Sequence, residues 1–493
     1  MLYTITIILA LLLVGLYKYL LSPFLSCSLS RIPNAHLTSP FSTQWIESVR
    51  AAGKETLTIH SLHAKYGPIV RLSPSELSVN SVQGLRVIYT RAFEKHPLYR
   101  QLFLNFKTDN LVGMLGNKEH ARQKRMLSRV YSKSYLQDSV DLRKVSGVVL
   151  GRRLLPILHD IAKKGNEVNV LPLFQAVGMD FTSAYLFGLG NGTEYLMHIE
   201  SWKRWLEEYE AFKHATPDER ADGFVERWCL GLCQQVNNQA TESGSEAVVY
   251  NSLRQALEKS PDDRPLDIAI ASELLDHLIA GHETSGITFT YMMWELSQRP
   301  DLQRLLRGEL LTLKPALHYP FPTDRMEDSF PNPSSIDALP LLDAILRETL
   351  RLHAPASSPL PRVTPDIPGG VSINGIDGIP GGVTVSSSAY TLHRIEEVYP
   401  HATEWLPQRW LDPGTKKHDM RRLWWPFGSG GRMCLGSNFA LQEIKLVMAA
   451  VYTNYTTEIV DDEGIEQDLA EFISLPKGRK LVLRFRPVES AAI

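Results

Sequence analysis

The segment FGSGGRMCLG, residues 427–436, holds one cysteine, Cys434, among four glycines and two positions after Arg432. Helical spacing of apolar residues follows it and predicts a helix from Leu435 to about Tyr455. The N-terminus of a helix presents free N–H groups and a partial positive charge, and both favour a thiolate over a thiol. Cys434 is therefore predicted to be a metal ligand.

A single thiolate narrows the choice of metal. Zinc and iron–sulfur sites need several Cys or His ligands, whereas haem iron takes one axial thiolate. The glycines are predicted to let the backbone lie against a flat macrocycle. Arg432 is predicted to bond a haem propionate, and Phe427 to shield the sulfur. The alternative for an isolated cysteine is a small, buried apolar side chain.

Other motif interpretations fail at single positions. A dinucleotide-binding G-x-G-x-x-G from Gly428 needs glycine where Met433 stands, and a metalloprotease H-E-x-x-H from His282 needs histidine where Gly286 stands. No Walker A sequence occurs in the 493 residues, and a formal charge of −2 gives no argument for nucleic acid as a partner.

The chain begins with an apolar segment, Leu2 to Leu21, that has no charged residue before Lys18. About 20 apolar residues span a bilayer as a helix, so we predict a transmembrane anchor; a cleaved signal peptide is the alternative. Because Lys18 and Arg31 follow the span, the body is predicted to face the cytoplasm. The predicted parts are an anchor over 1–21, a proline-containing hinge over 22–40 and a single domain over 41–493.

The remaining chain predicts a mainly α fold with a small β-rich part. Residues 266–299 are apolar nearly all round, which indicates a buried helix. A second helix is predicted to start at Pro340 and to stop before Pro355. Residues 361–390 are rich in Gly, Pro and β-branched residues, which is typical of short strands and turns. Cys229 and Cys233 lie one helical turn apart and are predicted to pack together on a helix face.

Four ordered motifs resemble the cytochrome P-450 family. The haem loop F-x-x-G-x-R-x-C-x-G is matched by Phe427, Gly430, Arg432, Cys434 and Gly436. The oxygen-activating helix motif is matched by AGHET, residues 280–284, the E-x-x-R pair by Glu348 and Arg351, and the arginine that joins this pair by Arg409. The resemblance covers nearly the whole chain beyond the anchor. The anchor and the composition of the loops look most like those of fungal microsomal members.

The resemblance implies the cytochrome P-450 fold, a haem (iron protoporphyrin IX) cofactor, and O2 with NADPH-derived electrons. Because the chain has no flavin or nicotinamide fingerprint, the electrons are expected from a separate NADPH–cytochrome reductase, with cytochrome b5 as a further donor. The expected place is the endoplasmic reticulum membrane, with a single span. The expected activity is a haem-thiolate monooxygenase; the alternatives are a reductase-independent isomerase or dehydratase and a non-catalytic haem sensor.

The predicted catalytic groups are Thr284 and Glu283. Oxygen activation requires protons, and a hydroxyl beside a carboxyl can relay and supply them. Gly281 is predicted to remove a side chain where a diatomic ligand must fit. The alternative for Thr284 is a structural hydroxyl bonded to its own i−4 carbonyl.

Charged residues are assigned to structure and to the propionates. Glu348 and Arg351 are i, i+3 neighbours that, with Arg409, are predicted to form a buried network positioning the haem loop. His120 and Lys124 match the place where the family usually offers an aromatic residue or His and then Arg. Lysine keeps the charge and loses the bidentate fork. Arg362 is the third predicted propionate ligand, and solvated surface is the alternative for these cations.

The substrate itself is not readable, but the resemblance places several pocket residues. The predicted walls are Phe103, Phe106, Ala280, Ser358, Leu360 and Ile473. They favour an apolar organic ligand of fungal secondary metabolism, and ordinary packing is the alternative for each.

The helix around His120 is predicted to divide its faces. Successive helical residues turn by about 100°, so His120 and Lys124 point towards the haem. The opposite cluster is Arg122, Arg125, Arg129 and Lys133. We predict that this cluster binds an acidic electron-transfer partner, with an ordinary solvated face as the alternative.

Overall fold

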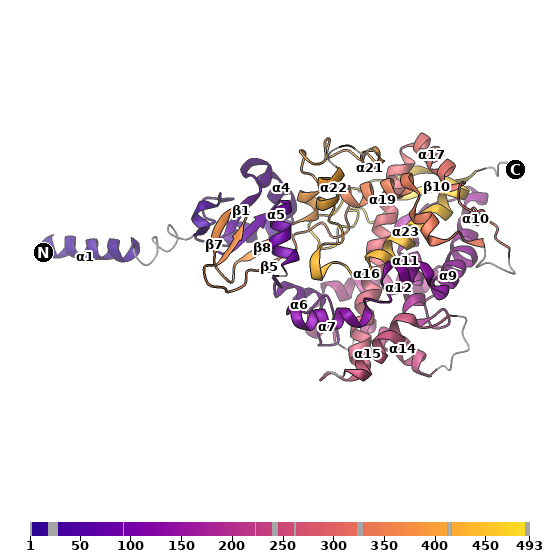
Figure 1. Cartoon of the computed structure of the whole chain (residues 1–493), viewed down its shortest axis with the longest axis horizontal. Coiled ribbons are helices and arrows are strands. Elements are labelled where there is room, and N and C mark those ends of the chain that lie inside the picture. Colours follow the sequence, from indigo (N-terminus) through magenta and orange to yellow (C-terminus); the bar gives the residue numbers. More distant parts are fainter. Residues whose placement is uncertain are drawn as a thin grey trace.

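The chain forms a large helical lobe and a smaller lobe that holds most of the strands (Figure 1). The computed structural model describes residues 2–17, 28–91, 93–221, 223–238, 245–260, 263–322, 329–411, 414 and 417–488. Most of these residues are helical, and the strands are short. The predicted fold class, mainly α with a small β-rich part, is confirmed.

The helices of the first half are α1 (Leu2–Leu16), α3 (Gln44–Ala51), α4 (Glu55–Tyr66), α5 (Val82–Leu85), α6 (Leu98–Phe103), α7 (Asn117–Leu127), α8 (Lys133–Asp138), α9 (Val140–Ser146), α10 (Leu155–Lys164), α11 (Val170–Phe187), α12 (Ile199–His214), α13 (Pro217–Arg220) and α14 (Phe224–Asn238). Those of the second half are α15 (Val248–Lys259), α16 (Leu266–Ser297), α17 (Pro300–Leu310), α18 (Pro333–Asp337), α19 (Pro340–Leu352), α20 (Ala389–Leu392), α21 (Gln408–Leu411), α22 (Lys417–Leu423) and α23 (Ser437–Asn454). Short 3-10 or π turns are η2 (Ser28–Arg31), η3 (Arg86–Thr90), η4 (Gly147–Leu154) and η6 (Gly430–Arg432).

Three sheets are present among the described residues. The strands are β1 (Ile69–Ser73), β2 (Glu76–Val79), β3 (Glu94–Lys95), β4 (Glu167–Asn169), β5 (Arg362–Val363), β6 (Val371–Ile373), β7 (Ile376–Ile379), β8 (Thr384–Ser386), β9 (Tyr455–Asp461) and β10 (Val482–Pro487). The largest sheet has the order β1-β2-β8-β5-β3, in which β2 and β8 are parallel. This order brings the segment before His120 beside Arg362, because Lys95 of β3 pairs with Arg362 of β5.

The long helix α16 crosses the helical lobe and packs closely on α11 (Figure 1). A Cβ added to Gly281 would lie 2.2 Å from Oγ1 of Thr182, and one added to Gly178 would lie 3.0 Å from the carbonyl oxygen of Gly281. These two helices therefore meet backbone to backbone. The reason predicted for Gly281, room for a diatomic ligand, is wrong in this respect, because its missing side chain faces α11.

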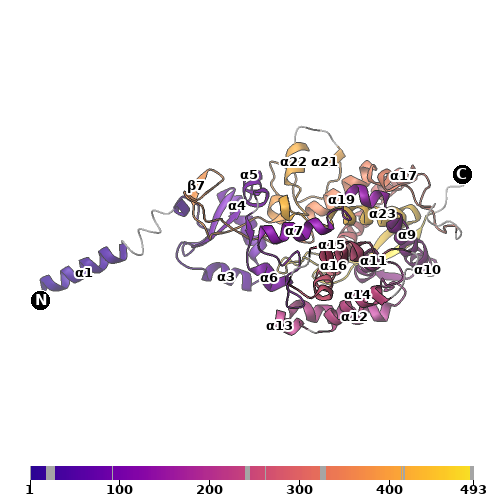
Figure 2. The ribbon, with the colours of Figure 1, turned by 60° about the horizontal axis from the view of Figure 1, so that its bottom comes forward.

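The predicted helices are confirmed with small shifts at their ends. α16 ends at Ser297 rather than at 299, α19 begins at Pro340 and ends at Leu352, and α23 begins at Ser437 rather than at Leu435. Cys229 and Cys233 lie buried on α14, which packs against α16. Figure 2 shows α12, α13 and α14 together along one side of the molecule.

The N-terminal helix α1 is described for 15 residues, and the rest of the predicted anchor, from Lys18 onward, lies outside the described residues. Exposed apolar side chains on α1 include Ile7, Leu11 and Val14. Among the described residues, one helix, Val170–Phe187, has both the length and the apolar character to cross a membrane. It is 94% buried and is the core helix α11, so it gives no argument for a span.

Candidate functional site

The cysteine loop ends just before α23 and is closed by a backbone hydrogen bond, in which Cys434 N–H donates to the carbonyl of Phe427 at 2.9 Å. Gly430 has a φ of +68°, and a Cβ there would lie 2.3 Å from the carbonyl oxygen of Tyr89. Glycine at this position is thus required by a turn and by close contact with η3. The prediction that it serves contact with a macrocycle is corrected.

The thiol of Cys434 is free and its residue is exposed. Although the residue is exposed on one side, the protein packed around its sulfur desolvates the thiolate and raises the pKa of the thiol. The N–H groups of Gly436 and Ser437 and the charge of Lys124 act in the opposite direction. These N–H groups stand at the start of α23, where the helix offers unpaired donors. The loop therefore presents an accessible sulfur whose anionic form has local donors.

Cations gather beside this sulfur. Arg432 donates to the carbonyls of Met114, Leu115 and Gly116 at 2.6–2.8 Å. Lys124 Nζ donates to the carbonyls of Gly431 and Met433, at 3.0 and 2.6 Å. Both predicted propionate ligands thus hold the haem loop to the segment before α7 and to α7 itself.

Arg362 and His120 complete the cluster, and Lys95 joins it. Arg362 donates to Tyr99 Oη at 2.9 Å, while its buried Nε has no partner among the described residues. Burial, and then the charges of Arg432 and Lys95, lower the pKa of His120 to about 3. Burial, and then the charge of Arg362, lower the pKa of buried Lys95 well below its usual value.

This donor set fits the acidic groups of a haem. Arg362, Arg432, Lys124 and Lys95 repel one another, and Arg362 has an unused buried donor. Two propionates placed here would relieve that repulsion and satisfy that donor. Together with an accessible thiol at a helix N-terminus, the residues present fit the group that the cysteine loop predicted.

The middle of α16 provides the facing surface. Most residues on either side are buried, but Ala280 is exposed and Gly281 and Thr284 are half-buried. Thr284 Oγ1 donates to the carbonyl of Ala280 at 2.8 Å, the i−4 contact expected for a structural hydroxyl. Since the hydroxyl also reaches accessible surface, it can exchange this intrahelical contact for one with a bound molecule.

Glu283 points elsewhere. Its carboxylate is buried, accepts a hydrogen bond from Tyr209 Oη at 2.8 Å and forms an ion pair with Lys213 Nζ at 2.9 Å. Both partners belong to α12, on a different side of α16 from the accessible surface. The structure therefore does not bring the Glu283 carboxylate to the Thr284 hydroxyl, as their adjacency in sequence predicted, because successive helical residues diverge by about 100°.

Glu348 and Arg351, both fully buried, form the centre of a network that Arg409 joins from its edge. Arg351 donates to both of its oxygens at 2.9 and 2.8 Å, Arg409 Nε donates at 2.9 Å and Trp410 Nε1 at 2.8 Å. Burial alone would raise the pKa of this carboxyl, but Arg351 and then Arg409 outweigh it and hold the pKa below its usual value. The predicted three-way network of Glu348, Arg351 and Arg409 is present.

A histidine that sequence reasoning missed connects this network to the haem loop. His393 Nδ1 donates to the carbonyl of Arg351 at 2.8 Å, and its Nε2 accepts from the backbone N–H of Trp425 at 2.7 Å. Trp425 Nε1 in turn donates to Ser429 Oγ in the loop. Nothing in the sequence around His393 marks it, because its partners lie more than 30 residues away in either direction.

Of the six predicted substrate residues, Ala280 lies on the accessible surface of α16, and the other five fall into two groups. The ring of Phe103 packs 5.3 Å from that of Phe472, next to Ile473, and Ser358 Oγ donates to the carbonyl of Glu471. The structure thus joins Phe103, Ser358 and the segment around Ile473 into one wall. This wall also includes Phe472, a residue that was not predicted.

The other predicted wall residues point to different neighbours. Leu360 packs on the core of the β-containing lobe, and its carbonyl accepts from Tyr89 Oη. Phe106 packs against the main helical core. Neither contact distinguishes a substrate wall from ordinary packing.

The four cations predicted to form one basic face, Arg122, Arg125, Arg129 and Lys133, do not all lie on one helix. His120 is buried and Lys124 turns to the haem loop, while Arg122 and Arg125 are exposed on the other side of α7. α7 ends at Leu127, so Arg129 lies beyond it. The prediction of one helix face holding all four cations is wrong in its extent.

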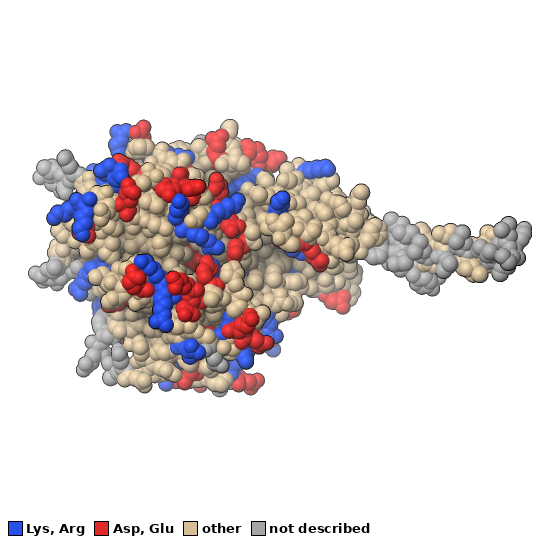
Figure 3. Space-filling view, turned by 180° about the vertical axis from the view of Figure 1, so that it is seen from behind, with Lys and Arg blue, Asp and Glu red and all other residues tan. Residues whose placement is uncertain are grey.

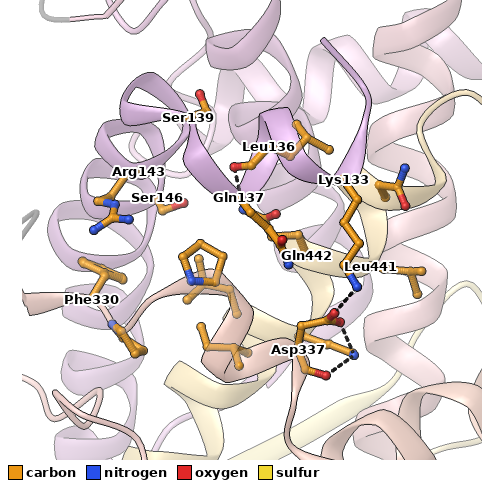
Figure 4. A pocket seen from close by; sticks show the side chains of 16 residues that line it. Lys133, Leu136, Gln137, Ser139, Arg143, Ser146, Phe330, Asp337, Leu441 and Gln442 are labelled. Carbon is orange, nitrogen blue, oxygen red and sulfur yellow. Dashed lines mark hydrogen bonds and ion pairs between the residues drawn. The ribbon is translucent and has the colours of Figure 1, made fainter. Parts of the chain in front are cut away.

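Lys133 starts α8, where it forms an ion pair with Asp337 beside a small cleft (Figure 4). This cleft has about 70 Å³ of free volume and lies between α8, α18 and α23. Because Asp337 neutralises the charge of Lys133, that lysine adds little to a basic surface. On the face seen in Figure 3, lysines and arginines are interspersed with acidic residues.

Comparison with known proteins agrees with this site. Residues 227–483, more than half of the chain, match the family described as Cytochrome P-450. Cytochrome P-450 monooxygenase avaI of Aspergillus versicolor is 28% identical, over 77% of this chain and 92% of that protein. Cytochrome P-450 monooxygenase FGM1 of Gibberella zeae is 27% identical over 87% of each chain, and the fusicoccadiene C-8 hydroxylase of Alternaria brassicicola is 25% identical over 88% and 86%.

The matched region contains Cys434, Glu348, Arg351 and Thr284. Members of this family use a haem iron, O2 and electrons derived from NADPH. The fold, the accessible thiol, the cation cluster beside it and the sequence match agree. The chain belongs to the cytochrome P-450 family and is a haem-dependent monooxygenase.

Proposed function

We propose that this monooxygenase is anchored in the endoplasmic reticulum membrane, takes electrons from an NADPH–cytochrome reductase and oxidises a largely apolar substrate of fungal secondary metabolism. The observation that carries the proposal is the accessible Cys434 thiol at the start of α23, with the cations Lys95, Lys124, Arg362 and Arg432 beside it. The relatives support the setting, since they are fungal monooxygenases.

In this proposal Cys434 holds the iron as a thiolate, supported by the N–H groups of Gly436 and Ser437. Arg362, Arg432 and Lys124 bind the propionates, with Lys95 adding charge. His120, buried in the same cation cluster, is a further proposed ligand of the propionates. When bound, the haem supplies activation of O2, with the thiolate donating electron density to the iron.

Thr284 is the proposed proton relay at the accessible surface of α16. Its hydroxyl donates a hydrogen bond to the Ala280 carbonyl until a molecule at this surface offers a better acceptor. Glu283 is the proposed proton reservoir, and Lys213 and Tyr209 hold its carboxylate on the α12 side. The Glu283 carboxylate, ion-paired with Lys213, must first take up a proton from water. That proton must then cross to Thr284 through water or through rotation of the Glu283 side chain.

The proposed membrane association is supported by apolar surface at the N-terminal end of the chain. α1 exposes apolar side chains, and Leu37, Phe41 and Leu57 are exposed in the β-containing lobe. Figure 3 shows few charged residues on the part of the body nearest to the N-terminus. The anchor over 1–21 and the hinge over 22–40 remain predictions, as does cytochrome b5 as a second electron donor.

The first experiment replaces Cys434 and compares products. Full-length protein in microsomes, reduced and treated with carbon monoxide, is expected to show the red-shifted Soret band of thiolate ligation, and Cys434→Ala to lose it. With reductase and NADPH, extracts of a host that lacks the gene are expected to yield a new product that carries one oxygen atom from O2, measured by mass spectrometry. A new product formed without NADPH would instead support the isomerase or dehydratase alternative.

A further inference from the structure

One buried carboxylate in the described part of the chain has no hydrogen-bond donor, and it belongs to Asp276 of α16. The other buried carboxylates each accept at least one hydrogen bond: Asp180, Glu226, Glu273, Glu283, Glu295, Glu348 and Glu443. Burying a carboxylate without a partner costs free energy. The Asp276 side chain is 92% buried and accepts no hydrogen bond, so it is a candidate to accept a hydrogen bond from a ligand.

Its position places it at the edge of the accessible surface of α16. Asp276 lies one turn before the exposed Ala280 and one turn after Ser272, whose carbonyl accepts a hydrogen bond from Asn105. Its charge also raises the pKa of the Cys434 thiol, so the carboxylate lies on the side of α16 that faces the haem loop. Asp276 thus stands between the segment that follows Phe103 and the proposed oxygen-activating surface.

The nearby protein cations are engaged elsewhere. Lys95 is the cation that interacts with Asp276, but its Nζ donates to the carbonyl of Val112 at 2.5 Å and lies 4.6 Å from the centre of the Tyr99 ring. No ion pair joins it to Asp276 among the described residues. The other titratable groups that face Asp276 are Glu273 and His277 on its own helix, and Tyr131 and Cys434 from neighbouring segments.

We propose that Asp276 binds a protonated amine of the substrate. A protonated amine supplies both the missing N–H donor and the opposite charge, and charge-assisted hydrogen bonds are the stronger kind. Phe103 and Phe472 of the same region pack on each other and are half-buried, so they leave apolar surface for an apolar body. This inference rests on the proposed function and narrows its substrate class to an apolar molecule with one basic nitrogen.

The test uses two probes of equal shape, N,N-dimethyl-4-phenylbutylamine and its carbon isostere (5-methylhexyl)benzene, with the full-length haem-loaded protein at pH 8. Equilibrium dialysis gives both dissociation constants, so the readout is binding rather than turnover. In Asp276→Asn the ratio of amine to isostere dissociation constants is expected to rise about 10- to 100-fold over wild type. Asp276→Glu is expected to recover part of the preference, and Glu443→Gln, a buried carboxyl paired only with Ser285, to leave the ratio unchanged.

A ratio that changes less than two-fold in Asp276→Asn, or that changes equally in Glu443→Gln, overturns the proposal. If Asp276→Asn does not retain haem, the wild-type protein decides instead. Amine binding must then strengthen from pH 5.5 to pH 8, as the carboxyl ionises, while isostere binding stays constant. The carbon monoxide spectrum separates failure of the proposed function from failure of this inference. If the wild-type protein lacks the thiolate band, the haem-thiolate assignment is refuted. If the band is present but the ratio of dissociation constants does not change in Asp276→Asn, only the role of Asp276 is refuted.

Discussion

The Glu348 network offers the sharpest test of how the fold supports the haem loop. In Glu348→Gln, two buried guanidinium groups lose their counter-charge. The glutamine amide also turns an N–H donor towards the donors of Arg351, Arg409 or Trp410. The wild-type carboxylate accepts from these three side chains and from the backbone N–H of Leu406 at 2.8 Å, and a single amide oxygen cannot replace it.

Removing one partner of a buried ion pair costs about 3–5 kcal/mol. The side chains of Glu348 and Arg351 are fully buried, so solvent does not screen this loss. If this loss lowers the activation free energy of unfolding by about 3 kcal/mol, the folded state unfolds about 100-fold faster. Arg351 also holds His393, which in turn holds Trp425, so the damage is expected to reach the haem loop.

The assay follows the decay of the thiolate carbon monoxide band at elevated temperature. Glu348→Gln is expected to lose it about 100-fold faster than wild type. Asp160→Asn, which breaks an ion pair whose two side chains are each 59% exposed, is expected to change the rate less than about three-fold. Equal half-lives for Glu348→Gln and wild type would refute the reasoning. Because the folded pKa of Glu348 lies below its usual value, the network stabilises at neutral pH and is lost as pH falls through that folded pKa.

Thr284→Val is expected to keep the carbon monoxide band while the yield of product per NADPH falls and hydrogen peroxide rises; unchanged coupling would leave Thr284 as a structural hydroxyl on Ala280. The double variant Arg125→Glu with Arg129→Glu is expected to slow haem reduction by the reductase at low salt, with unchanged spectra, because opposite charges steer such encounters; stopped-flow reduction at the wild-type rate would place the reductase elsewhere. Burial, and then the charge of Glu273, raise the pKa of Asp276 to about 7, so its ionisation destabilises the fold increasingly from about pH 4 to pH 7. Asp276→Asn is therefore expected to raise the melting temperature at pH 8 and to leave it nearly unchanged at pH 4; a lower melting temperature at pH 8 would contradict this.

Local sequence patterns were enough for the helices that carry the site. The apolar run of α16, the proline that starts α19 and the glycine-rich loop before α23 each act over a few residues, and the structure moves their ends by only one or two positions. The i, i+3 spacing of Glu348 and Arg351 likewise predicted their contact, because helix geometry alone brings them together.

Tertiary structure decided which way the neighbouring side chains point and what they contact. Thr284 and Glu283 are adjacent in sequence, yet one reaches accessible surface and the other an ion pair with Lys213 on α12. Lys95 joins the cation cluster because β3 pairs with β5, more than 260 residues later. His393 and Asp276 are likewise defined by partners, present or missing, from distant segments. The physical reason is that a repeating backbone sets contacts within a helix, whereas contacts between elements depend on how those elements pack, and short-range patterns do not carry that information.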